Sequence, residues 1–238
     1  MELSDYIANA FPISFLEFAA AVLGSLYLKR IPGHKSAKLF VAFLWFTVIF
    51  ELLASYAPLT YFFKLEVFSF VLDTPFETNY WAYNIYFLIN YFVYITYVKW
   101  QLVSRWQRKL INILLALFLS TSIVNLFTSQ VFFEAFSAYT NITGTLVLLF
   151  VIGLYYYQLV RSDMVLRIGW LLPFYVTIGA VILHVCLTPF LIYSAYFQSA
   201  IHPDFTGAYL IVLKVINLLV YSIYILGFII CRRKKSLY

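Results

Sequence analysis

The feature that most constrains this sequence is a series of long apolar runs that recur along nearly the whole chain. Each run is about 20 residues long, the length that an α-helix needs to cross a ~30 Å hydrocarbon core. The chain is 64% hydrophobic and 11% charged, whereas charged residues make up roughly 25% of a typical water-soluble domain. Too little polar surface is left to cover a soluble core of this size. We therefore expect an integral membrane protein.

The runs predict an all-α integral membrane fold, a seven-transmembrane-helix bundle that forms a single domain over residues 1–238. Inside a bilayer every backbone polar group must be satisfied within the protein, which favours helices for these runs. Proline in the second and sixth runs is expected to kink those helices, at Pro58, Pro173 and Pro189. The predicted spans cover residues 6–28, 39–63, 81–98, 110–130, 141–160, 168–196 and 207–231.

Basic residues cluster between alternate spans and so predict an orientation. All Lys and Arg except Lys64 and Lys214 fall in four clusters, which follow the first, third, fifth and seventh spans. By the positive-inside rule this side is cytoplasmic. We therefore predict a multi-pass protein of the plasma membrane (the bacterial inner membrane), with its N-terminus outside and its C-terminus cytoplasmic. Topology explains the formal charge of +6, so no nucleic-acid partner is expected.

Partners are expected at the cytoplasmic side. The last basic cluster suits contact with anionic lipid headgroups, and the basic loops offer a surface for a membrane or cytoplasmic partner protein. The residues of that cluster are Arg232, Arg233, Lys234 and Lys235.

Four ionisable side chains lie within the apolar runs: Glu17, Glu51, His184 and Lys214. Charges at membrane depth cost about 2.5–3.5 kcal/mol each on insertion scales, so they usually face a partner or a water-filled cavity. Counting residues from the span centres places both glutamates near the midplane and the other two nearer the outside. We predict that the four form a ligand or ion network in the bundle interior.

Helical spacing supports a shared interior, because each charge lies on a polar or small-residue face of its own span. Glu17 lies on one face with Ala20, Ala21 and Gly24, a stripe of small residues that allows close helix packing. A network of this kind has two readings: a functional site, or buried polar groups that only fix helix register. The supporting polar residues are Asn90, Asn217, Tyr221, Thr47 and Ser55.

Motifs for catalysis, metals and cofactors are missing from the sequence. No catalytic residue is predicted, and no metal site, since the three histidines do not cluster with cysteines or carboxylates at ligand spacing. Seven spans, an outside N-terminus and a lysine in the last span resemble the architecture of microbial rhodopsins. The residues before Lys214, however, contain no aspartate one turn away, and the third span has no Arg–Asp counter-ion pattern. We therefore expect no retinal and no other cofactor.

Function is less constrained than fold. The leading prediction is a receptor-like or sensory module with an outward-facing polar cavity, which is not an enzyme. One alternative is a small-solute or ion transporter that uses Glu17, Glu51 and Lys214, with proton coupling as an option. Another is an intramembrane lipid-modifying enzyme with His184 and a glutamate as acid and base. A structural subunit of a membrane complex is the fourth alternative. The leading prediction, a receptor-like module, depends largely on analogy at the level of architecture.

Overall fold

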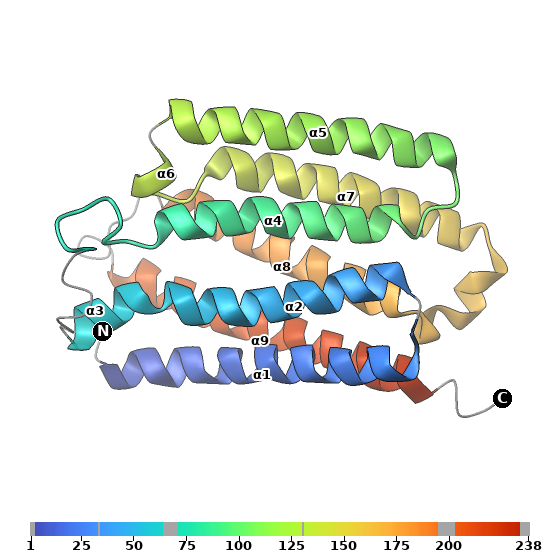
Figure 1. Ribbon diagram of the computed structural model, residues 1–238, viewed down its shortest axis with the longest axis horizontal. Helices are drawn as coiled ribbons and strands as arrows, with labels where there is room; N and C mark the ends of the chain where they lie inside the picture. Colours follow the sequence, from blue (N-terminus) through green and yellow to red (C-terminus); the bar gives the residue numbers. More distant parts are fainter. Residues whose placement is uncertain (1–2, 33, 64–70, 130, 195–202, 234–238) are drawn as a thin grey trace.

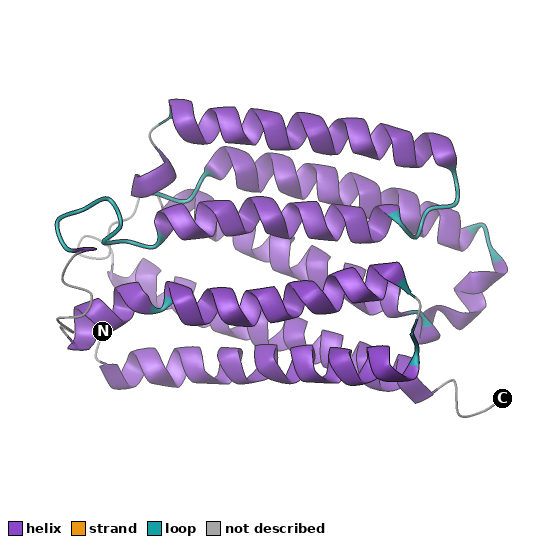
Figure 2. Cartoon of the chain, viewed as in Figure 1, coloured by secondary structure: helices purple, strands orange, loops and turns teal. Residues whose placement is uncertain are grey.

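The computed structural model describes residues 3–32, 34–63, 71–129, 131–194 and 203–233, and this part of the chain is helical, without strands. The helices run roughly along one long axis and form a bundle (Figures 1 and 2). The elements are α1 (Leu3–Arg30), α2 (Lys35–Ala54), α3 (Tyr56–Phe63), α4 (Tyr80–Lys99), α5 (Arg105–Thr128), α6 (Val131–Glu134), α7 (Ala138–Val160), the 3₁₀ helix η2 (Asp163–Trp170), α8 (Leu172–Ser194) and α9 (Pro203–Arg233).

Six helices in the described part of the chain are long and apolar enough to cross a membrane: α1, α2, α5, α7, α8 and α9. The protein is therefore a membrane-type helical bundle. The helix at the predicted third span, α4, is 20 residues long but rich in tyrosine and asparagine, and more than half of its residues are buried. Its polar groups face other helices, which explains why its sequence is less apolar. The seven-span count and the outside N-terminus stay predictions.

Contacts between helices define a closed ring in the order α1, α2, α4, α7, α8, α9 and back to α1. The fifth helix, α5, packs outside this ring against α4 and α7. Its outward side exposes large apolar side chains such as Trp106, Leu117 and Phe127, as expected for a surface covered by lipid. In this ring α1 has the last helix, α9, on one side and α2 on the other.

The predicted second span is wrong as a single helix, because it consists of α2 and α3 with a break at Ser55. Pro58 has no N–H to donate to the carbonyl of Ala54, four residues earlier, and its ring clashes with a helical carbonyl there. The Ala54 carbonyl instead accepts a hydrogen bond from the Asn79 amide at 3.3 Å. Glu51 therefore lies one turn before the end of α2, rather than at the centre of a single helix over residues 39–63.

The predicted sixth span also differs at its start. Residues 163–170 form η2, and α8 begins only at Leu172. Pro173 occupies the first turn of α8, where a missing N–H breaks no helical hydrogen bond, so it starts the helix rather than kinking it. Pro189 does lie inside α8. The predicted end of this span at residue 196 lies outside the described residues.

One end of the bundle is basic. The α1–α2, α4–α5 and α7–α8 connections and the end of α9 all lie together, on the right of Figure 1. The basic clusters occupy these connections: Lys29 and Arg30 end α1, Lys99 ends α4, and Arg161 follows α7. The charge pattern of the sequence is thus matched by a segregation of charge in space.

The basic half of the ring is filled by aromatic side chains. Phe40, Tyr94 and Tyr97 pack with Tyr224 and Phe228, with ring centroids 5.0–6.2 Å apart. These five side chains are at most 2% exposed. The Tyr94 and Tyr224 hydroxyls also hydrogen-bond each other at 2.7 Å. This aromatic layer, defined here as these five residues, closes the interior of the bundle toward the basic end.

The small-residue face of α1 packs as its spacing predicts. Ala20 and Ala21 are fully buried, and Gly24 lies where a Cβ atom would fall 2.8 Å from Val41 of α2 and 3.0 Å from Phe228 of α9. Only a residue without a side chain permits this approach. The same face therefore carries Glu17 into the interior of the ring.

Candidate functional site

A cavity of about 460 Å³ lies among the helices of the ring, mostly in the half opposite the basic end. Its lining comes mainly from the first halves of α1, α4 and α9, the start of α7 with the turn before it, and the second halves of α2 and α8. Much of the lining is apolar, as Leu183, Leu187 and Leu213 illustrate. All four sequence-predicted residues, Glu17, Glu51, His184 and Lys214, are among the lining residues. The structure therefore brings them to one cavity, although it does not join them in one hydrogen-bonded network.

The two glutamates occupy different positions in the cavity. Glu17, in the middle of α1, is 5% exposed, whereas Glu51 near the end of α2 is half-buried. The Tyr83 hydroxyl donates a hydrogen bond to Oε2 of Glu51 at 2.7 Å. Among the described residues neither carboxyl group is ion-paired. A charged carboxylate with no cation beside it is costly in a largely apolar surrounding.

Lys214 does not pair with a glutamate. Its Nζ donates to the carbonyl oxygen of Ala8 at 3.0 Å and to Oδ1 of Asn9 at 3.3 Å, both on α1. Those acceptors precede Glu17 by two turns or more, about 12 Å along a helix. The lysine therefore connects α9 to the first part of α1, and the expected Lys214–glutamate network is not formed in this structure.

His184 lies against two tyrosines of α4. Its ring centroid is 4.4 Å from that of Tyr91 and 5.6 Å from that of Tyr94. The side chain is 6% exposed, and its Nε2 atom has no hydrogen-bond partner among the described residues. Asn90 is 3% exposed, and its Oδ1 atom also has no partner in this part of the chain. Because buried polar atoms are nearly always paired, the two unpaired atoms make this wall of the cavity unusual in energy.

The supporting residues divide into two groups. Asn90, Asn217 and Tyr221 line the cavity, and the Asn217 amide donates to the Leu213 carbonyl at 2.8 Å.

Thr47 and Ser55 do not line it. The Thr47 hydroxyl pairs with the Tyr86 hydroxyl at 3.1 Å, and the Ser55 hydroxyl donates to the Leu52 carbonyl at 2.6 Å. The Thr47 bond joins α2 to α4, whereas the Ser55 bond stays within the last turn of α2.

A hydrogen-bonded group beside the cavity was not predicted from the sequence. The Tyr91 hydroxyl donates to the Asn141 carbonyl at 3.0 Å and pairs with Thr145 at 2.9 Å, and Thr145 in turn pairs with Thr188 at 2.9 Å. This chain joins α4, α7 and α8 and fixes the tyrosine ring against which His184 packs. No local signal separates Tyr91 from the other tyrosines of α4, because its partners lie about 50 residues away or more.

Asn84 is a second polar residue that sequence reasoning missed. Its amide donates to the carbonyls of Phe132 and Ala135 at 3.1 and 2.9 Å, and its Oδ1 accepts from the Ser137 backbone N–H at 2.9 Å. These bonds hold the turn between α6 and α7 against α4, and that turn supplies Phe136 to the cavity.

No group of three or more potential metal ligands occurs among the described residues. No protein family, curated protein or solved structure matches this chain.

Proposed function

We propose that this multi-pass membrane protein is a receptor-like module that binds a small organic cation in the cavity opposite its basic end. The observation that carries the proposal is the composition of the cavity wall. Glu17 and Glu51, whose carboxyl groups are not ion-paired among the described residues, line the same space as the polar residues His184 and Asn90.

The size and lining of the cavity support a small amphipathic ligand. Its volume of about 460 Å³ falls in the roughly 300–1,000 Å³ range of small-molecule sites, which are mostly apolar with a few placed polar groups. An ammonium group would offset the charge of the glutamates, and tyrosine rings attract cations further. The leucines of α8 and α9 would cover the apolar part of the ligand.

The floor of the cavity supports binding from one side. The aromatic layer packs the interior of the bundle toward the basic end, and most of the described residues that line the cavity come from the opposite half. Under the predicted orientation the cavity would face the outside of the cell. A ligand could then be sensed without passing through the membrane, its occupancy shifting the packing of α1, α8 and α9.

A matched pair of probes tests the proposal. We expect phenethylamine, which is protonated at pH 7, to raise the melting temperature of the purified protein in detergent, and phenethyl alcohol to raise it far less. Glu17→Gln should remove most of the response to the amine. Glu77→Gln, the same change at an exposed position, should preserve it. Equal shifts with the alcohol, or an undiminished response in both Glu17→Gln and Glu51→Gln, would show that the carboxyl groups do not bind a cation.

A transporter is the second candidate, favoured by the position of Glu17 and His184 in the middle of long apolar helices. Buried ionisable groups of this kind mark ion and substrate pathways in pumps and transporters. Proteoliposomes distinguish the two candidates: a transporter takes up labelled amine faster than protein-free liposomes do under the same conditions, whereas a receptor adds only saturable binding.

The remaining alternatives have less support. An acid–base pair for lipid chemistry needs His184 and a glutamate in hydrogen-bond reach, yet Nε2 of His184 has no partner among the described residues. The exposed apolar side of α5 suits lipid as well as a partner subunit, so it does not favour a structural role.

A further inference from the structure

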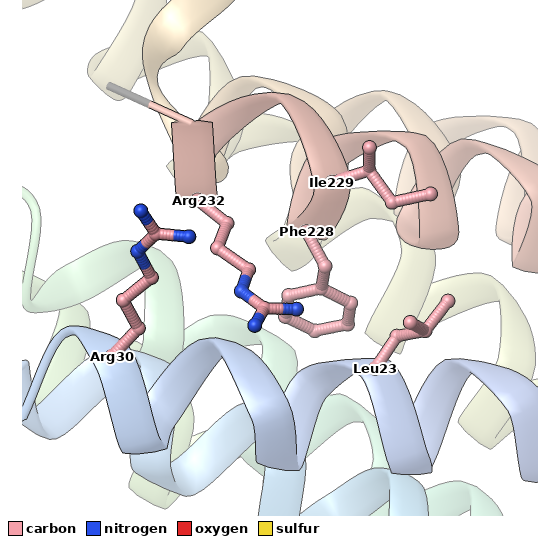
Figure 3. A pocket seen from close by; sticks show the side chains of 5 residues that line it. All are labelled: Leu23, Arg30, Phe228, Ile229 and Arg232. Carbon is pink, nitrogen blue, oxygen red and sulfur yellow. The ribbon is translucent and has the colours of Figure 1, made fainter. Parts of the chain in front are cut away.

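A second hollow lies at the basic end of the bundle, between α1 and α9. Its volume is about 260 Å³, and it is lined by Leu23, Arg30, Phe228, Ile229 and Arg232. Figure 3 shows the two arginines approaching from the two helices, with the Arg232 side chain extending over Phe228 toward α1. The hollow thus combines two guanidinium groups with an apolar floor.

The guanidinium groups lack an anion. No carboxylate among the described residues pairs with Arg30 or Arg232, and Nε of Arg232 is buried without a hydrogen-bond partner. Two like charges held beside one groove repel each other, and a buried N–H without an acceptor costs further free energy. A phosphate group would offset the two positive charges, because guanidinium forks bind phosphate oxygens through paired, charge-assisted hydrogen bonds.

The depth of the two arginines identifies the source of the phosphate. Arg30 is the last residue of the first apolar span, and Arg232 is the last residue of the final one. Side chains at span ends lie at the level of lipid headgroups. Leu23 and Ile229 lie further into the spans, where an acyl chain would run.

We propose that the hollow between α1 and α9 binds one anionic phospholipid, with its phosphate between Arg30 and Arg232 and an acyl chain against Leu23 and Ile229. The contact between α1 and α9 closes the ring of helices, so this lipid would join the first and last helices of the bundle. The inference is independent of the ligand cavity in the other half. Of the sequence-predicted lipid cluster it uses Arg232 alone; Lys234, Lys235 and the side chain of Arg233 lie outside the described residues.

Native mass spectrometry and melting temperature with short-chain lipids test the proposal. We expect dioctanoyl phosphatidylglycerol to bind and stabilise the wild-type protein more than dioctanoyl phosphatidylcholine. Arg30→Gln combined with Arg232→Gln should weaken phosphatidylglycerol binding about 30-fold, since each surface arginine contributes about a factor of five near anionic lipid. The control combines Arg105→Gln with Arg167→Gln, two exposed arginines at the same end, and should bind like the wild type.

Two further measurements complete the test. One compares free phosphate with phospholipid, and the other uses a variant that keeps both positive charges. Inorganic phosphate at millimolar concentration should not stabilise the protein, because it lacks the acyl chain; equal stabilisation by phosphate would overturn the lipid assignment. Arg30→Lys with Arg232→Lys keeps both charges but removes the guanidinium forks, so it should bind phosphatidylglycerol more weakly than the wild type and more tightly than the double glutamine variant. Wild-type binding by the double glutamine variant, or an equal loss in the control, would overturn the site.

Discussion

Gly179 of α8 offers a sharp test of the aromatic layer beneath the cavity. A Cβ atom at this position would overlap the ring of Tyr224, lying 2.8 Å from its Cζ and 2.9 Å from its hydroxyl oxygen. The ring has little room to move away, because its hydroxyl is hydrogen-bonded to Tyr94 at 2.7 Å and its face packs on Phe40. Gly179→Ala therefore forces α8 and α9 apart or breaks the tyrosine pair.

The expected cost follows from this geometry. Overpacking a close-packed interior typically costs about 1–3 kcal/mol, partly offset by the better helix propensity of alanine, worth roughly 1 kcal/mol at most. We expect Gly179→Ala to lower the free energy of unfolding by about 1–2 kcal/mol. On the scale of water-soluble proteins of this size, each kcal/mol lowers the melting temperature by about 2–4 °C.

Gly153 of α7 provides the matched control. A Cβ atom there meets nothing within 4 Å, so Gly153→Ala should leave stability unchanged or slightly raised. Unfolding in mixed detergent–SDS micelles, followed by tyrosine and tryptophan fluorescence, measures both variants. If Gly179→Ala unfolds at the same SDS fraction as Gly153→Ala, the close packing of α8 on Tyr224 is refuted, and with it the closed floor of the cavity.

Three further predictions concern polar contacts and topology. Asn84→Ala should destabilise the protein by about 2–4 kcal/mol, because it leaves several buried backbone groups unpaired; an unchanged SDS midpoint would contradict this. Tyr83→Phe should cost about 1–3 kcal/mol by removing the donor to Glu51, whereas Tyr83→Phe in a Glu51→Gln background should cost less. In a cysteine-free background, Glu77→Cys should react with an impermeant maleimide in intact cells and Arg167→Cys only after lysis; the reverse pattern would invert the orientation.

Much of the helix arrangement could be predicted because it follows from the spacing of apolar and small residues within each segment. Ala20, Ala21 and Gly24 recur at helical spacing with Glu17, and that face is buried. The neighbours of α1, which are α2 and α9, follow from short connections and from the closure of the bundle. The apolar runs indicate membrane helices for the same reason, since length and hydropathy are properties of each segment alone.

The details of the candidate site depend on contacts between distant segments. Periodicity gives the inward face of a helix, but it does not say which residue of a neighbouring helix lies at the same depth. Lys214 is level with Ala8 and Asn9 rather than with Glu17, and this axial offset is set by how α1 packs on α9. The placement of His184 against Tyr91 likewise requires the pairing of α4 with α8.

The sequence by itself determined that this chain is a helical membrane protein with its basic residues in alternate connections, because hydrophobic transfer and charge burial act segment by segment. Tertiary structure alone decided that α4 joins the ring while α5 lies outside it. It also decided that α2 stops before Pro58 and that the four ionisable residues of the apolar runs line one cavity without bonding to one another. Those outcomes depend on the relative offset and order of whole helices, which are fixed only when all the side chains of the bundle pack together.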